Sequence, residues 1–190
     1  MHDNNSERVS GVSLNIEEST YEDVKKIILK DRDGNIGRSD LRIPDLTDYI
    51  DICKKYGKVC VLELKSNFSK DELESIGNAF KEREYFDKVV VISFNFGVLL
   101  KYRELYPDQP IQYLTGYEYK FSDETVEKLQ TLKADWDANY FTLNKENVDY
   151  CHSIGIKVNA WIVNKPEDAQ ALLDLGVDFI TTNILELFIL

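Results

Sequence analysis

The sequence lacks several features that mark common protein classes. Its 190 residues include three cysteines, Cys53, Cys60 and Cys151, and none of them forms a Cys-x-x-Cys pair. An odd number of widely spaced cysteines is typical of reduced, structural thiols, so we expect a cytoplasmic protein. No apolar run approaches the ~20 residues that span a bilayer, and the polar first residues do not resemble a signal peptide. We therefore expect no transmembrane segment.

Basic residues are also in short supply. The chain has 23 lysines and arginines against 34 aspartates and glutamates, which gives a formal net charge of −11. A field of that sign repels polyanions and no basic stripe offsets it, so we expect no nucleic-acid binding. A small anionic substrate remains compatible with this charge, because a cation held by carboxylates reverses the local field. The sequence has no Gly-x-Gly-x-x-Gly motif, so a dinucleotide-binding fold gains no support.

Hydrophobic residues make up 43% of the chain, enough for a single domain over residues 1–190. From residue 59 onward, short β-branched runs alternate with amphipathic segments. We expect strands over residues 59–65, 88–94, 111–115, 134–140, 156–163 and 177–181, and helices over residues 70–83, 97–105, 122–132, 145–153 and 166–175. This alternation predicts a parallel sheet with right-handed crossovers. It fits either an open sheet or most of a (β/α)8 barrel.

Residues 1–55 show weaker patterns. Residues 1–11 are polar and predict a loop, and Ser19 or Thr20 can cap a short helix within residues 16–30. Residues 31–35, Asp-Arg-Asp-Gly-Asn, predict a turn, because the glycine comes too early for a calcium-binding loop. Pro44 predicts the start of a helix that continues to residue 55.

The strand over residues 59–65 carries the most informative residues. Its first four residues are apolar and predict a strand that is buried on both faces. Glu63 and Lys65 follow, two residues apart, so both point to one side of the strand at its C-terminal end. Charged groups are rarely buried unpaired, and ligands of parallel α/β folds bind at the C-terminal strand ends. The pair therefore predicts either a ligand site or a structural ion pair.

Further polar residues follow the other predicted strands. They are Ser93, Asn95, Tyr113, Thr115, Trp161, Asn164, Thr182 and Asn183. In a barrel these strand ends converge on one rim. Ser93, Asn164 and Asn183 can each be explained as a helix cap, but the coincidence over several strands favours a site.

Four segments, in this order, resemble motifs of the glycerophosphodiester phosphodiesterase family. Residues 62–65, Leu-Glu-Leu-Lys, are similar to its Glu-x-Lys strand, and residues 91–95, Val-Ile-Ser-Phe-Asn, to its Gln-Ser-Phe strand. Residues 155–164 resemble Gly-x-x-Val-x-x-Trp-Thr-Val-Asn, and residues 176–183 resemble Gly-Val-Asp-x-Ile-x-Thr-Asp. The resemblance covers nearly the whole chain. It implies a TIM (β/α)8 barrel of the PLC-like phosphodiesterase type, which hydrolyses glycerophosphodiesters to an alcohol and glycerol 3-phosphate in lipid metabolism.

The resemblance also implies roles for four residues. Glu63 would ligate a divalent cation, Mg²⁺ or Ca²⁺, and Lys65 would contact the phosphate. His2 begins a segment similar to the family's His-Asp-x-x-x-x-Arg and would protonate the leaving alkoxide. Trp161 would offer an apolar face to glycerol or to a cationic head group, with packing in the core as the alternative.

The sequence departs from the family in ways that change these expectations. The family's His-Arg-Gly and Glu-x-Asp segments are absent, and Asn183 stands where the family has aspartate. We therefore expect an N-terminally truncated member, an incomplete barrel with its first two strands missing and about six parallel strands present. Such a chain should bind its cation weakly and hydrolyse slowly or not at all. Unpaired edges at residues 59–65 and 177–181, beside the apolar residues 185–190, predict self-association.

Two other interpretations stay open. The chain could be a non-catalytic barrel remnant that acts as a binding or assembly module. It could also be an unrelated α/β enzyme that uses Glu63 and Lys65.

Overall fold

The computed structural model describes residues 2–184 and divides into two compact units, Met1–Ile52 and Cys53–Leu190. In the first unit, helix α1 (Glu7–Ser10) occupies part of the segment predicted as a loop. Helix α2 (Tyr21–Lys26) begins after Thr20, which is one of the two predicted caps. The Thr20 side chain accepts a hydrogen bond from the backbone N–H of Asp23. The predicted turn at residues 31–35 is confirmed by a 3.0 Å bond from the Gly34 N–H to the Asp31 carbonyl.

Helix α3 (Leu46–Lys55) runs across the boundary between the two units. It begins two residues after Pro44, at a point where the Asp48 carboxylate accepts a 3.1 Å hydrogen bond from the Asp45 N–H. The proline therefore lies just outside the helix and not at its first position.

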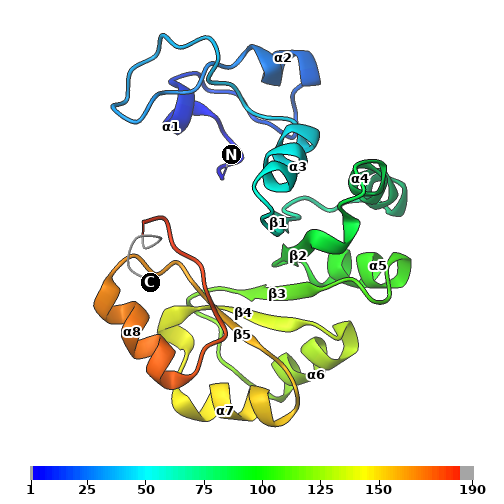
Figure 1. Cartoon of the computed structure of the whole chain (residues 1–190), viewed down its shortest axis with the longest axis vertical. Helices are drawn as coiled ribbons and strands as arrows, with labels where there is room; N and C mark the ends of the chain where they lie inside the picture. The colour runs from blue at the N-terminus through cyan, green and yellow to red at the C-terminus, as the bar shows by residue number, and fades with distance from the viewer. Residues whose placement is uncertain (1, 185–190) are drawn as a thin grey trace. The chain divides into compact units, whose positions relative to one another are not determined.

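The second unit is built on six parallel strands in sequence order. They are β1 (Cys60–Glu63), β2 (Val89–Ser93), β3 (Ile111–Thr115), β4 (Asp135–Asn139), β5 (Val158–Trp161) and β6 (Phe179–Ile180). The sheet curls as part of a TIM barrel, so the predicted fold class is confirmed (Figure 1). Parallel neighbours in sequence order require every connecting helix on the outer side of the curl.

Among the described residues, the outer layer consists of five helices and two short 3₁₀ turns. They are α4 (Lys70–Glu82), η1 (Phe86–Lys88), α5 (Phe96–Leu105), α6 (Asp123–Leu132), η2 (Tyr140–Thr142), α7 (Lys145–Ser153) and α8 (Pro166–Leu175). Local sequence sets their ends: Ser69 and Glu72 form a capping box on α4, and Gly176 ends α8 at φ +97°. No helix within residues 2–184 has the length and apolarity needed to cross a membrane.

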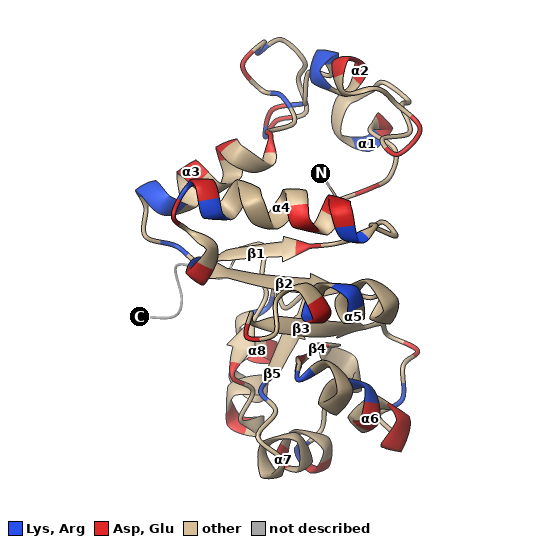
Figure 2. Ribbon diagram, turned by 90° about the vertical axis from the view of Figure 1, so that its right-hand side faces the viewer, with Lys and Arg blue, Asp and Glu red and all other residues tan. Residues whose placement is uncertain are grey.

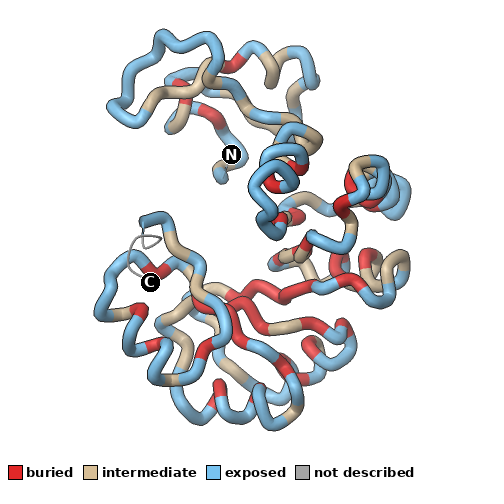
Figure 3. Tube along the Cα trace, in the orientation of Figure 1, coloured by how far each residue is buried: buried red, intermediate tan, exposed pale blue. Residues whose placement is uncertain are grey.

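The core lies between the strands and the outer helices (Figure 3). Val91, Trp136 and Val158 are fully buried there, on the outward side of their strands. The prediction that the first strand is buried on both faces is wrong. Cys60 and Leu64 are buried, but Val61, on the opposite side of β1, is 49% exposed. That side faces the concave interior of the sheet, and β1 is an end strand with β2 as its partner in the described sheet.

Charged residues lie mostly on the helices, and the strands carry few of them (Figure 2). Within the strand bounds the exceptions are Glu63 in β1 and Asp135 and Asp137 in β4. A carboxylate on a strand of a parallel sheet requires a partner or a function. These residues therefore direct attention to the concave side of the sheet.

Candidate functional site

Glu63 and Lys65 lie at the C-terminal end of β1 and form an ion pair. The Lys65 Nζ is 3.5 Å from the Glu63 Oε2, and the two side chains are 34% and 25% exposed. Glu63 is in register with Ile92 of β2, so it belongs to the row of side chains that alternates with the buried outward row. Glu63 is thus half-buried on the concave side and Lys65 is exposed, so the pair remains accessible to a small ligand.

Trp161 reaches the same concave side from β5. Its indole ring meets the Phe94 ring edge to face, with centroids 5.7 Å apart, and its Nε1–H donates a 3.2 Å hydrogen bond to the Asp137 carbonyl. Because two strands separate β2 from β5, the ring contact spans the interior of the curl. Trp161 is half-buried, whereas the tryptophan that packs fully in the core is Trp136.

Asp137 is a site residue that sequence reasoning missed. It is 1% exposed, and its Oδ1 has no hydrogen-bond partner among the described residues. Burial, with a smaller contribution from the nearby charge of Glu63, raises the pKa of its carboxyl group to about 8, whereas the Asn159 amide acts in the opposite direction. The available signal was a pair of carboxylates, Asp135 and Asp137, alternating with a tryptophan inside a predicted strand.

Polar side chains from β3, β5 and the end of β6 surround this carboxyl group. The Asn159 Nδ2 donates to the Gln112 Oε1 at 3.4 Å and to the Thr181 Oγ1 at 3.1 Å. Asp137 and Asn159 are direct neighbours in register. The concave side therefore has a floor rich in oxygen atoms below the Trp161–Phe94 pair.

Several residues that were predicted to lie on the rim lie elsewhere in the structure. Thr115 faces the outer layer, where its Oγ1 accepts a 2.9 Å hydrogen bond from the Trp136 Nε1–H, and Tyr113 is buried beside Phe96 on the same side. Both alternate with Gln112 and Leu114, which take the concave side. Placing Tyr113 and Thr115 on the rim was wrong because the register of β3 turns them outward.

The helix-cap explanation is also wrong for Ser93 and Asn164. The Ser93 Oγ donates a 2.6 Å bond to the Leu64 carbonyl, and the residue that caps α5 is Asn95. The Asn164 Oδ1 accepts a 3.0 Å bond from the Asn183 N–H, so it ties together the loops that follow β5 and β6. Asn183 lies at this end of the sheet through that bond. Residues 185–190, predicted to form an apolar tail, fall outside the described residues.

His2 belongs to the first unit, and its role stays a prediction. Its Nδ1 lies 3.0 Å from the Asp3 Oδ1, and the Arg8 guanidinium binds both oxygens of the same carboxylate, at 2.5 and 3.1 Å. Arg8 and then His2 hold the pKa of Asp3 well below its usual range. The histidine and the arginine of the His-Asp-x-x-x-x-Arg segment thus both contact its aspartate.

Within residues 2–184, no three His, Cys, Asp or Glu side chains are grouped closely enough to hold a metal ion.

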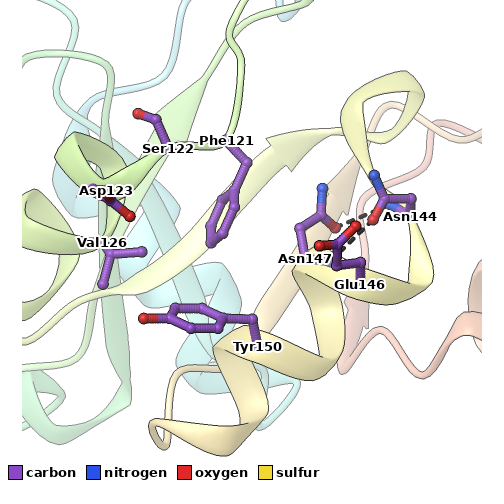
Figure 4. A pocket seen from close by; sticks show the side chains of 8 residues that line it. All are labelled: Phe121, Ser122, Asp123, Val126, Asn144, Glu146, Asn147 and Tyr150. Carbon is purple, nitrogen blue, oxygen red and sulfur yellow. Dashed lines mark hydrogen bonds between the residues drawn. The ribbon is translucent and has the colours of Figure 1, made fainter.

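The second unit also has a pocket of about 340 Å³ in the outer layer, between the starts of α6 and α7 (Figure 4). Phe121 and Tyr150 line it with rings 6.0 Å apart, and the Asn144 and Asn147 side chains are engaged in a capping box. Its polar groups serve the helix ends, so it is not the candidate site.

Comparisons with known proteins show which family the chain resembles. The model of the Glycerophosphoryl diester phosphodiesterase family matches residues 1–187. The chain is 25% identical to a glycerophosphodiester phosphodiesterase of Bacillus subtilis, over 99% of this chain and 69% of that protein. It is 25% identical to another from Caldanaerobacter subterraneus, over 96% of this chain and 75% of that protein. A crystal structure of a glycerophosphodiester phosphodiesterase from Parabacteroides distasonis has a TM-score of 0.74 at 26% identity, covering 96% of this chain and 72% of that one.

Proposed function

Because the chain belongs to the glycerophosphoryl diester phosphodiesterase family, a family of phosphoric diester hydrolases, we propose that it hydrolyses glycerophosphodiesters to an alcohol and glycerol 3-phosphate. This reaction would serve lipid metabolism. The observation that carries the proposal is the accessible Glu63–Lys65 ion pair at the end of β1, on the same concave side as Trp161. Their residue types suit a phosphate, its counter-cation and the apolar part of a substrate.

A divalent cation fits the donor set on this side of the sheet, since the set consists of oxygen atoms and includes one buried oxygen that has no hydrogen-bond partner among the described residues. Glu63 would hold the cation, and a bound Mg²⁺ or Ca²⁺ supplies charge that neutralises the phosphoryl oxygens in the transition state. Lys65 contacts a non-bridging phosphate oxygen as a compact positive charge. Trp161 presents its ring to the glycerol or head group and orients the diester.

Hydrolysis breaks the bond between phosphorus and the alcohol oxygen while water forms a new bond to phosphorus. The leaving alkoxide needs a proton, and His2 would supply it. The other histidine of the chain, His152, is engaged elsewhere: its Nε2 lies 2.9 Å from Asp178, on the side where β5 and β6 begin. His152 is therefore no substitute for a catalytic histidine on the rim.

We expect turnover to be slow. The sequence contains no His-Arg-Gly and no Glu-x-Asp, so it lacks the second catalytic histidine and two carboxylates that the family resemblance implies. Hard divalent ions gain affinity from the number and charge of their oxygen ligands. Weak cation binding and slow hydrolysis follow.

The direct test measures release of glycerol 3-phosphate from glycerophosphocholine by the full chain with Mg²⁺ or Ca²⁺. Glu63→Ala and Lys65→Ala should each abolish the release. The matched controls are Glu104→Ala and Lys70→Ala, which break an exposed 2.7 Å ion pair on the outer helices and should leave the rate unchanged. A rate that survives Glu63→Ala would contradict the site.

One observation favours a second candidate function, a non-catalytic binding module. Within the described residues, no three His, Cys, Asp or Glu side chains are grouped closely enough to hold a metal ion. In that case calorimetry would detect glycerol 3-phosphate binding that Lys65→Ala weakens, with no hydrolysis under any cation.

We also propose a cytoplasmic location and self-association. Three buried, free cysteines support a reducing compartment. The end strands β1 and β6, each with a single strand neighbour in the described sheet, support pairing between copies.

A further inference from the structure

The Asp137 carboxyl group poses an energetic problem that the proposed function does not solve. A buried carboxylate oxygen without a partner costs several kcal/mol unless it is protonated or compensated by a cation. Burial and the charge of Glu63 raise the pKa of Asp137, and the Asn159 amide lowers it. Neither of these two residues is positively charged. Its Oδ1 makes no hydrogen bond among the described residues.

The position of Asp137 in β4 directs this oxygen to the concave side. Its neighbours Trp136 and Ala138 are fully buried on the outward side, so Asp137 points the other way. Its register partners are Leu114 and Asn159, which share that side. Glu63 is in register with Ile92, which alternates with the buried Val91 and Ser93, so its side chain also belongs to the concave row.

Neutral oxygen donors complete the surroundings. The Gln112 Oε1 accepts a long 3.4 Å hydrogen bond from Asn159, and an amide oxygen has a second lone pair to offer. The amide nitrogen of Asn159 donates to Gln112 and Thr181, and the same amide also acts on the Asp137 carboxyl group. Two carboxylates and an amide oxygen form the all-oxygen set that Ca²⁺ and Mg²⁺ select.

We propose that Asp137 and Glu63 hold one divalent cation between them, with the Asp137 Oδ1 as the second carboxylate ligand and the Gln112 Oε1 as a neutral ligand. This inference rests on the cation site in the proposed function and adds a ligand to it. The cation removes the repulsion between the two carboxylates and gives the unpartnered oxygen its partner. The competing explanation is that Asp137 is a neutral acid with no ligand.

Calorimetric titration of the full chain with Ca²⁺, without substrate, separates these explanations. The wild type should bind one Ca²⁺, and Asp137→Asn, which keeps the side-chain shape, should bind at least about tenfold more weakly. Asp135→Asn is the matched control, because Asp135 lies two residues earlier in β4 and accepts a 3.0 Å bond from the Lys157 N–H. Its affinity should stay within about twofold of the wild type.

Thermal unfolding gives a second measurement that does not depend on activity. A ligand that binds the folded state raises the midpoint, so Ca²⁺ should raise that of the wild type and of Asp135→Asn but not that of Asp137→Asn. Loss of binding in Glu63→Gln with full binding in Asp137→Asn would overturn this inference and leave the cation site of the proposed function standing. No binding by the wild type at about 10 mM Ca²⁺, roughly tenfold above the dissociation constants of the weakest calcium sites, would overturn both.

Discussion

At the scale of single residues, the Asp137 carboxyl group makes folding depend on pH. Its ordinary pKa is 3.8, and burial raises the pKa in the folded chain to about 8. Below pH ~4 the group is protonated in both states and has no effect. Between pH ~4 and ~8 the unfolded chain releases the proton and the folded chain keeps it, so the free energy of unfolding falls as pH rises. Each pKa unit is worth about 1.4 kcal/mol, so the loss is of the order of several kcal/mol.

Urea unfolding in the presence of a chelator tests this prediction. From about pH 5 to about pH 8.5, an interval that covers most of the range between the two pKa values, the wild type should lose more stability than Asp137→Asn. The asparagine cannot ionise in this interval. At the upper pH the variant should be the more stable protein. Parallel curves for the two proteins would show that the carboxyl group has an ordinary pKa in the folded chain.

Arg103 provides a second prediction at this scale. Its guanidinium donates hydrogen bonds to the Leu132 and Lys133 carbonyls at the end of α6 and to three carbonyls between α5 and β3, those of Tyr106, Pro107 and Gln109. A lysine has a single nitrogen and cannot reach both groups of acceptors. Arg103→Lys should lower the free energy of unfolding by about 2–4 kcal/mol, measured by urea unfolding.

The control for Arg103 is Arg38→Lys. Arg38 forms an ion pair with Asp40 in which both side chains are more than 60% exposed, 62% and 64%. This change should alter stability by less than about 0.5 kcal/mol, because exposed ion pairs contribute little. Equal effects of the two substitutions would contradict a structural role for the Arg103 guanidinium.

At the scale of elements, the packing of α4 against the end of α5 depends on a glycine. A Cβ atom added to Gly77 would lie 2.1 Å from the Tyr106 Oη and 2.6 Å from its Cζ. The Tyr106 ring packs against Phe86 and Tyr102, each at 4.9 Å, and cannot easily move away. Gly77→Ala should therefore destabilise the fold by about 1–3 kcal/mol in thermal or urea unfolding.

Gly97→Ala is the matched control in α5. A Cβ there would meet the Asn95 Oδ1 at an ordinary 3.4 Å. Alanine also favours a helix over glycine by about 0.5–1 kcal/mol, so this substitution should be neutral or stabilising. If Gly77→Ala were stabilising as well, the close approach of Tyr106 would not exist in solution.

The bounds of the helices and strands were largely predictable from the sequence, but the orientation of their side chains was not. Helices α4, α6, α7 and α8 and strand β3 lie within a residue of their predicted bounds, because caps, Gly176 and β-branched runs are local signals. The side of the sheet to which a side chain points depends on the register between neighbouring strands, and no local sequence pattern contains that register. Tyr113 and Thr115 were therefore misplaced, and Val61 was wrongly predicted to be buried.

Part of the candidate site was predictable from local sequence, and part depended on the arrangement of the strands. Glu63 and Lys65 stand out because they interrupt an apolar run at a strand end. Asp137 lies in β4, whose sequence Asp-Trp-Asp-Ala-Asn is a weak strand pattern, so its carboxyl group gave no clear signal of burial. Its importance follows from the strands on either side of it, which bury it and bring Glu63 within electrostatic reach.

At the scale of the whole molecule, net charge and exposed strands act in opposite directions on self-association. Strands β1 and β6 each have a single strand neighbour in the described sheet, which favours pairing between copies, and they carry Val61 and Phe179, which are 49% and 46% exposed. The net charge of −11 makes the copies repel one another. Salt screens that repulsion over a Debye length of about 10 Å at 0.1 M, so added salt should promote association.

Sedimentation velocity at low and high salt measures this balance, and Val61→Lys tests which surface is responsible. The new charge on β1 should hold the protein monomeric at high salt, because a lysine on an edge strand opposes pairing. Val12→Lys changes the net charge by the same amount at a 54% exposed valine of the first unit and should leave the salt-induced association intact. Since both variants carry the same net charge, a difference between them isolates the strand edge from the overall field. A monomer at every salt concentration would mean that the end strands are not a pairing surface.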